Sequence, residues 1–246
     1  MQIFIDNVKI DRLLQIALII AAIIISSCRN IPETKTDALP YTIGEVLISE
    51  DFSGNLSQWT IEGERPEIIN GRLEFDTKAF SVIWLKPSLI GNVMIEYDII
   101  VSGPDSSGES EGSFGCFAMA IDPANPNKFF ASGKERAGEL SMYDNLNLYY
   151  FESGCGKSKS EKFLKYSDGK KELIDEKKGS KYSIAPNKPY HVKLIFFEKT
   201  IELYLNDKCI FHYLDFFPYT KGNYGLTIFD NRISIDNLVI THLLRL

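Results

Sequence analysis

Residues 92–102 read NVMIEYDIIVS, and this stretch shows the clearest periodicity in the chain. Its apolar side chains return at every second position and share one face: Val93, Ile95, Tyr97, Ile99 and Val101. The opposite face carries a mixed set that includes two carboxylates: Met94, Glu96, Asp98 and Ile100. A period of two indicates a β-strand with one buried face. The stretch therefore predicts a strand that packs on a core through one side only.

Short segments of the same character extend on both sides of this strand. We expect strands at 41–49, 57–62, 80–86, 114–121, 145–151, 191–198, 201–206, 208–214, 223–229 and 232–241. Asn70-Gly71 adds a hairpin turn, because this pair readily takes the two positive-φ positions of a type I′ turn. No long window shows a convincing helical period. These features predict an all-β fold, an antiparallel two-sheet jelly-roll sandwich.

The strands before residue 122 and after residue 188 are both needed to form one pair of sheets. We therefore expect residues 41–246 to form a single jelly-roll domain with a loop-rich insertion around 122–188. Part of the insertion mixes lysines with acids, and we interpret that part as a solvent-exposed hairpin or loop edge.

The composition limits the class of protein. Hydrophobic residues make up 44% and charged residues 24%, which excludes a mainly disordered chain. The 16 Phe, 12 Tyr and 2 Trp residues supply enough apolar surface for a large core. With a net charge of −6, the chain lacks the basic surface that general nucleic-acid binding needs. We expect no nucleic-acid partner.

The first 27 residues read as a targeting segment. An apolar run over 13–25 is shorter than the ~20 residues that span a bilayer and suits a signal-peptide core. It ends in Ile25-Ser26-Ser27-Cys28, which resembles a bacterial lipobox. The resemblance implies that residues 1–27 are removed as a lipoprotein signal peptide and that Cys28 carries a diacylglycerol. An ordinary membrane anchor, or a secretory peptide that happens to contain a cysteine, is the alternative.

The segment that follows the lipobox reads as a tether. Residues 28–40 are polar, with proline near both ends, and twelve extended residues reach ~40 Å. Arg29 stands where some bacteria place the aspartate that retains a lipoprotein in the inner membrane, so we expect the outer membrane. Three further cysteines, Cys116, Cys155 and Cys209, allow one disulfide in an oxidising envelope, and the sequence leaves its pairing open.

Several stretches, taken in order, resemble the concanavalin A-like lectin/glucanase superfamily. They are 48–53 with Trp59, 70–73, 93–98, the meander that ends at Leu214, 225–228 and 235–238. Within that superfamily the chain is most similar to the YesU-like bacterial family. The resemblance implies a jelly roll of two curved sheets whose concave face forms a glycan groove. Such proteins often belong to polysaccharide-utilisation systems.

The resemblance also shows where this chain departs from its relatives. Laminarinase-type glycosidases of the superfamily carry Glu-x-Asp-x-Glu on one strand, which places three carboxylates on one face. Here Glu96 and Asp98 match the first two, but Ile100 replaces the third. The retaining mechanism is therefore not supported. Glu96 and Asp98 remain the candidate catalytic residues, because neighbouring carboxylates can raise one pKa for acid–base work.

A second group of residues suggests contacts with sugar. Asn145, Asn147 and Tyr149 share one face of an expected strand, with Tyr143 just before it. Amides bind vicinal hydroxyls and a ring stacks on a pyranose, although a plain solvent-facing sheet explains the same pattern. Trp84 is a candidate stacking platform, with core packing as its alternative. The histidine that precedes the Tyr-Tyr pair in the YesU-like pattern is absent here, which puts in doubt any activity that depends on it.

Two function hypotheses follow from these observations. The first is a lipid-anchored protein that captures oligosaccharides, and the second is a glycan-processing enzyme, either a glycoside hydrolase or a polysaccharide lyase. A scaffold protein without a glycan ligand is a third reading. Neither glycan hypothesis requires a cofactor. Asp51 and Asp236, near the first and last strands, could share a structural calcium ion, as the terminal strands of the superfamily often do.

Overall fold

The computed structural model describes residues 40–102, 112–154, 160–179, 182 and 184–246. The chain divides into two units, Met1–Pro40 and Tyr41–Leu246, and the second unit holds every described strand. The helical parts among its described residues are three single turns: η1 (Phe129–Ser132), α2 (Gly133–Arg136) and η2 (Leu140–Tyr143). No helix in the described residues has the length and apolar character of a membrane span.

The first sheet, sheet A, has eight strands in the order β14-β13-β12-β7-β16-β4-β3, and β1 also pairs with β16. All its pairs are antiparallel. The strand bounds are β1 (Tyr41–Glu50), β3 (Glu67–Ile69), β4 (Arg72–Thr77), β7 (Val93–Val101), β12 (Pro189–Phe197), β13 (Thr200–Leu205), β14 (Lys208–Leu214) and β16 (Asn231–Arg245).

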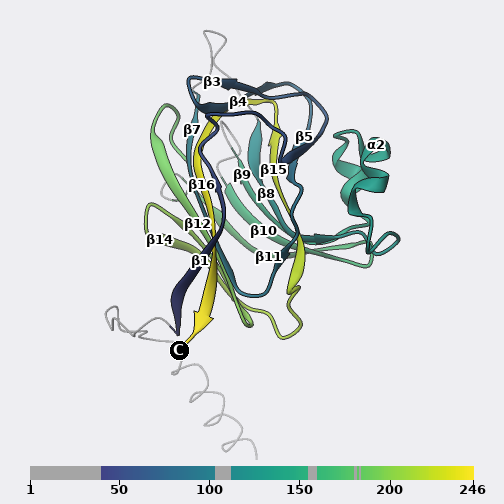
Figure 1. Cartoon of the computed structure of the whole chain (residues 1–246), viewed down its shortest axis with the longest axis vertical. Helices are drawn as coiled ribbons and strands as arrows, with labels where there is room; N and C mark the ends of the chain where they lie inside the picture. Colours follow the sequence, from purple (N-terminus) through teal and green to yellow (C-terminus); the bar gives the residue numbers. More distant parts are fainter. Residues whose placement is uncertain (1–39, 103–111, 155–159, 180–181, 183) are drawn as a thin grey trace, which may run out of the picture. The chain divides into compact units, whose positions relative to one another are not determined.

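The second sheet, sheet B, also has eight strands, in the order β11-β10-β9-β8-β15-β5-β2, and β6 also pairs with β15. Its bounds are β2 (Trp59–Glu62), β5 (Ser81–Leu85), β6 (Leu89–Ile90), β8 (Ser113–Ile121), β9 (Asn147–Gly154), β10 (Ser160–Ser167), β11 (Lys170–Lys178) and β15 (Lys221–Phe229). The two sheets form the layers of a sandwich (Figure 1). The predicted all-β, antiparallel two-sheet fold is confirmed.

The core lies between the sheets and is built from the alternating pattern of the strands. Along β7 every second residue from Val93 to Val101 is buried, and the residues between them are partly exposed. The buried side chains join those of both sheets in one continuous apolar cluster. At about 25 cal/mol for each square ångström of apolar surface removed from water, this cluster is the main stabilising contribution to the fold.

The region around 122–188 differs from the expected loop-rich insertion. Strands β9, β10 and β11 lie within it and belong to sheet B. The irregular part, residues 122–146, contains the three helical turns and packs on the outer face of sheet B (Figure 1). We call residues 122–146 the cap.

A buried ion pair holds the cap on sheet B. Arg136 donates from Nη2 and Nε to the carboxylate of Glu62 on β2, at 2.6 and 2.9 Å, and both side chains are almost fully buried. The hydroxyl of Tyr143 donates to the same carboxylate at 2.8 Å. Gly138 has φ +77°, and a Cβ there would lie 2.6 Å from the Cα of Gly63, so only glycine allows this close approach.

Candidate functional site

The outer face of sheet A carries a cluster of polar side chains around His191. Its Nδ1 lies 2.8 Å from Oδ1 of Asp98, and its Nε2 lies 3.3 Å from Oε1 of Glu96. Asn237 donates from Nδ2 to the second oxygen of Asp98 at 2.9 Å. We call Glu96, Asp98, His191 and Asn237 the His191 cluster. It remains open to solvent, because 42% of the His191 side chain is exposed.

Strand register and one irregularity bring these residues together. In the antiparallel pairing of β16, β7 and β12, Asp98 lies opposite both Asp236 and His191. The register shifts between Asp236 and Val239, and Asn237 within this irregular segment has φ +53°. Such a bulge re-aims a side chain relative to the regular strand. Asn237 can therefore reach Asp98 across the sheet.

The charges of the cluster stabilise one another. Burial raises the pKa of Asp98, but hydrogen bonds from Asn237 and His191 outweigh this effect and hold the pKa below its ordinary value. Burial lowers the pKa of His191, but the bonds to Asp98 and Glu96 outweigh it and raise that pKa. The imidazolium is therefore favoured and donates to the two carboxylates. The cluster offers a proton donor and several acceptors at the protein surface.

A second ion pair continues the polar row toward β4. Arg72 donates from Nη1 to Asp236 at 2.9 Å and from Nε to the hydroxyl of Ser234 at 2.5 Å. Asp236 lies opposite Asp98 in the register, so the pair is adjacent to the His191 cluster. Carboxylate, imidazole, amide and guanidinium groups thus follow one another across four strands.

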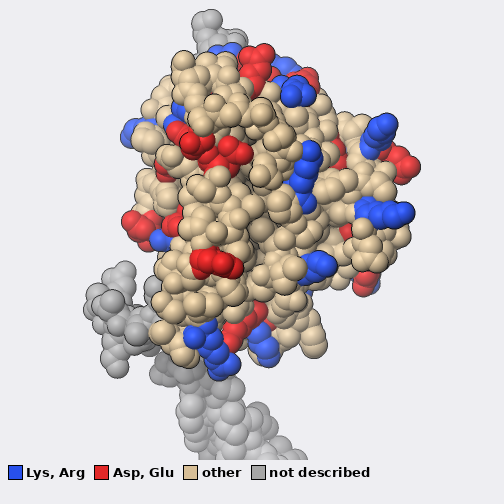
Figure 2. Space-filling model, in the orientation of Figure 1, with Lys and Arg blue, Asp and Glu red and all other residues tan. Residues whose placement is uncertain are grey.

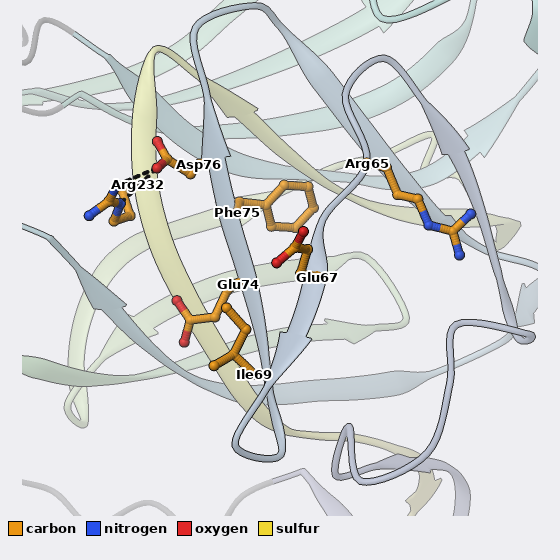
Figure 3. Close-up of a pocket in the computed structure, with 7 residues that line it drawn as sticks. All are labelled: Arg65, Glu67, Ile69, Glu74, Phe75, Asp76 and Arg232. Carbon is orange, nitrogen blue, oxygen red and sulfur yellow. Dashed lines mark hydrogen bonds and ion pairs between the residues drawn. The ribbon is translucent and has the colours of Figure 1, made fainter.

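A pocket of about 530 Å³ lies beside this row, over β3, β4 and the start of β16. Figure 3 shows its lining residues: Arg65, Glu67, Ile69, Glu74, Phe75, Asp76 and Arg232. Arg232 donates from Nε to Asp76 at 3.0 Å and also from Nη2. By the strand period, Glu74 and Asp76 share a face with Arg72, so the pocket and the polar row lie on the same side of β4.

The candidate aromatic contacts are in the interior, which corrects the expectation that they offer rings to a sugar. Trp84, Tyr143 and Tyr149 each have an exposed fraction of 0%. Trp84 stacks on Phe117 beneath the cap, with a centroid distance of 5.6 Å, so it is a core residue. Tyr149 lies between the sheets, and its hydroxyl donates to Asp215 at 2.6 Å.

The two candidate amides lie on the other sheet from the His191 cluster. Asn147, at the start of β9, accepts a bond from the backbone N–H of Asp168 at 2.8 Å. Asn145 is exposed just before this strand. Asn147 thus holds the turn between β10 and β11. The structure does not bring either amide together with Glu96 and Asp98, which lie on the other sheet.

The arrangement of the expected calcium ligands argues against a shared site. Asp51 accepts a bond from the backbone N–H of Ser53 at 3.0 Å, and Asp236 is paired with Arg72, whose charge repels a cation. Within the described residues, no group of three His, Cys, Asp or Glu side chains could hold a metal ion. Cys28 and Cys155 lie outside the described residues, whereas Cys116 and Cys209 are free thiols.

Sequence reasoning found Glu96 and Asp98 but missed their partners. His191 falls on an expected strand, and its pairing with Asp98 depends on the strand order. Arg72 closes the predicted Asn70-Gly71 hairpin, yet nothing local to it indicates Asp236 as its partner. Asn237 depends on an irregularity in a long strand, which leaves no pattern in the sequence. These three side chains are placed by tertiary structure.

Comparisons with solved structures support the fold. A Bacillus subtilis protein of unknown function with a galectin-like fold superposes with a TM-score of 0.71 at 16% identity, covering 84% of this chain and all of the other. The carbohydrate-binding module CBM66 from Bacillus subtilis gives 0.56 at 20% identity, covering 77% and 99%. The Bacillus licheniformis β-glucanase gives 0.56 at 10% identity, covering 81% and 98%. At these identities the likeness shows a galectin-like, concanavalin A-like fold.

Sequence comparison adds the family. No curated protein sequence matches the chain. A family model described as a domain of unknown function, DUF6250, matches residues 75–238, most of the two-sheet sandwich. The chain belongs to the DUF6250 family.

Proposed function

We propose that this protein binds oligosaccharides through the outer face of sheet A, anchored by a lipid on Cys28 to the bacterial envelope, in the service of polysaccharide utilisation. The observation that carries the proposal is the polar row formed by the His191 cluster and the Arg72–Asp236 pair. Most of its side chains are partly exposed and already held by hydrogen bonds. A sugar therefore meets oriented donors and acceptors.

The chemistry of the row suits a polyhydroxylated ligand. Each sugar hydroxyl donates one hydrogen bond and accepts others, and planar carboxylate, amide and guanidinium groups can bind two neighbouring hydroxyls at once. The row runs into a pocket of about 530 Å³, which is within the usual size range for small-ligand sites. A short oligosaccharide could occupy the pocket and extend over the row.

The cap explains why we place the ligand on sheet A. The resemblance to lectins implied an open glycan groove, but the cap covers much of the outer face of sheet B with apolar side chains. Phe80, Trp84 and Phe117 there are all almost fully buried. On the outer face of sheet A, a smaller apolar cluster buries Ile195 and Phe197 at one end, whereas the carboxylates of Glu96 and Asp98 remain accessible.

Two of the fold relatives are named for glycans, which supports a glycan ligand here. One is a carbohydrate-binding module and the other a β-glucanase. The galectin-like protein from Bacillus subtilis, whose function is unknown, covers this chain best among the three. We propose the YesU-like relationship on the sequence resemblance alone. The fold itself accommodates both binding and catalysis, so the site must decide between them.

One observation favours a glycan-processing enzyme as a second candidate. His191 lies between Glu96 and Asp98, and its hydrogen bonds to these carboxylates outweigh burial and raise its pKa, which stabilises the imidazolium form. Such a group can serve as a general acid toward a leaving oxygen. The retaining glycosidase mechanism still lacks its third carboxylate, because Ile100 occupies that position.

The proposed anchor and tether join the sandwich at the strand that begins with Tyr41. The second unit begins at Tyr41, whose ring packs on Phe197 with a centroid distance of 5.1 Å. Lys199 follows Phe197 by two residues, and its ammonium lies 5.4 Å from the ring centroid of Phe216. Phe217, the residue after Phe216, is 86% exposed. An exposed phenylalanine pair beside a lysine suits a lipid interface.

The test is a glycan panel with a matched pair of variants. Full-length protein, purified in detergent, is incubated with plant and algal polysaccharides, and both retention on the polysaccharide and release of products are measured. We expect retention without products for at least one polysaccharide. Asp98→Asn should weaken retention, whereas Glu172→Gln, an exposed carboxylate on β11 of sheet B, should leave it unchanged. Products that disappear in Asp98→Asn would favour the enzyme. Equal retention of both variants would remove the His191 cluster from the site.

A further inference from the structure

A second pocket lies on the opposite side of the molecule, where the cap meets sheet B. Its volume is about 450 Å³, and its charged lining consists of Lys86, Lys128 and Lys221. The lysines come from three separate segments: the turn after β5, the cap before η1, and the start of β15. No carboxylate lines the pocket. We call it the lysine pocket, and Figure 2 shows basic side chains in the region where the cap meets the body.

The three ammonium groups have no carboxylate partner among the residues that the structure describes. Lys86 donates from Nζ to the backbone carbonyl of Ser57 at 2.6 Å, which leaves its charge uncompensated. Asp122 at the start of the cap is the nearest acid in sequence to Lys128, but it is buried. It accepts bonds from the Ser132 hydroxyl at 2.6 Å and from the Ala124 N–H at 2.9 Å. The Asp122 carboxylate is therefore held by hydrogen bonds within the cap and forms no ion pair with a lysine of the pocket.

The three uncompensated lysines indicate that the pocket favours an anionic ligand. The protein carries a net charge of −6, so its overall field repels anions. Three like charges around one cavity also repel one another, and a bound anion relieves that repulsion. The local charge therefore selects a negatively charged ligand against the sign of the whole molecule.

The remaining lining indicates that the anion belongs to a sugar. Phe129 and Phe130 form an edge-to-face pair with ring centroids 5.2 Å apart, and Phe130 is partly exposed beside the lysines. An aromatic ring beside polar groups suits the apolar face of a pyranose. The polar groups include Asn223, which is only 4% exposed, and Ser88, whose hydroxyl donates to the Asn223 side-chain oxygen at 3.3 Å.

We propose that the lysine pocket binds an acidic saccharide, through the carboxylate of a uronic acid or the sulfate of a sulfated sugar. The inference rests on the proposed glycan function for the class of ligand, but not on the site assigned to sheet A. Charge-assisted hydrogen bonds from the lysines would supply the affinity, and the Phe130 ring would distinguish a sugar from a free anion.

The experiment is titration calorimetry of the full-length protein with trigalacturonate, its methyl ester, a sulfated disaccharide and inorganic sulfate. At least one acidic sugar should bind about tenfold more tightly than the methyl ester, which lacks the charge, and than inorganic sulfate, which lacks the sugar ring. The affinity should fall with added salt. Whichever acidic sugar binds identifies the anion.

The variant Lys128→Gln/Lys221→Gln should bind the acidic sugar about tenfold more weakly, since two charges are removed. Lys134→Gln/Lys170→Gln removes two exposed lysines outside the pocket and should bind normally. Undiminished binding in the first variant, equal binding of inorganic sulfate, or no binding of either acidic sugar would overturn the proposal.

Asp98→Asn tests whether the sheet A site and the lysine pocket are separate. If Asp98→Asn loses retention of neutral glycans but still binds trigalacturonate, both proposed sites are supported. If Lys128→Gln/Lys221→Gln retains neutral glycans but loses trigalacturonate, the acidic ligand is assigned to the lysine pocket alone.

Discussion

The carboxyl group of Glu161 should make this fold less stable as the pH rises. Glu161 lies on β10, is 1% exposed, and points between the sheets. One oxygen accepts a hydrogen bond from the hydroxyl of Ser153, and the other has no hydrogen-bond partner in the described residues. Burial raises its pKa from the ordinary 4.5 to about 8, so the folded protein holds the proton at neutral pH.

The direction and size of this change in stability follow from the pKa of Glu161 in the unfolded chain and in the folded protein. Below pH 4.5 both states are protonated, and the group has no effect on the pH dependence. Between 4.5 and about 8 the unfolded chain releases the proton while the folded chain keeps it, so the free energy of unfolding falls as pH rises. At about 1.4 kcal/mol per pH unit, the total loss is about 5 kcal/mol.

Urea unfolding, followed by tryptophan fluorescence at a series of pH values, measures this loss. We expect Glu161→Gln to flatten the decline of the unfolding free energy across this range, because glutamine cannot ionise. Glu172→Gln, which changes an exposed carboxylate on the neighbouring strand, should keep the wild-type slope. A slope in Glu161→Gln as steep as in the wild type would refute the assignment of the proton to this residue.

Three further predictions concern the cap, the core and the anchor. Glu62→Gln should destabilise the protein by about 3–5 kcal/mol and expose residues 122–146 to protease, because it leaves Arg136 buried without its partner; a cleavage pattern like that of the wild type would contradict the role given to this ion pair. Tyr149→Ala should lower the unfolding free energy by about 3–5 kcal/mol, since it opens a cavity between the sheets; an unchanged urea midpoint would show that the ring is not a core residue. Cys28→Ser should move the protein from the membrane fraction to the soluble fraction, and continued sedimentation with membranes would argue for a different anchor.

The strand class and the two-sheet arrangement could be predicted from the sequence because they depend on a local period. The alternation around Glu96 and Asp98 correctly assigned those carboxylates to the outward face of β7. A period of two, however, says only which residues share a face. It does not say whether another part of the chain covers that face.

This limit explains the misplaced aromatic residues. Trp84 lies on the outer face of its strand, and it is buried because the cap packs over it. The cap in turn depends on the ion pair between Glu62 and Arg136, whose positions are 74 residues apart in sequence. The His191 cluster depends on strand order and on the irregularity around Asn237. Contacts of this kind arise from the assembled tertiary structure, and single-sequence patterns do not reveal them.

The most direct test of the glycan site is to map a bound oligosaccharide by NMR. Protein labelled with nitrogen-15 at histidine and asparagine is titrated with the oligosaccharide that the panel identifies. We expect the largest shift changes at the His191 ring and the Asn237 amide, with little change at Asn145 or Asn147 on sheet B. Changes confined to sheet B, or binding that leaves the His191 ring unperturbed, would contradict the placement of the glycan on sheet A.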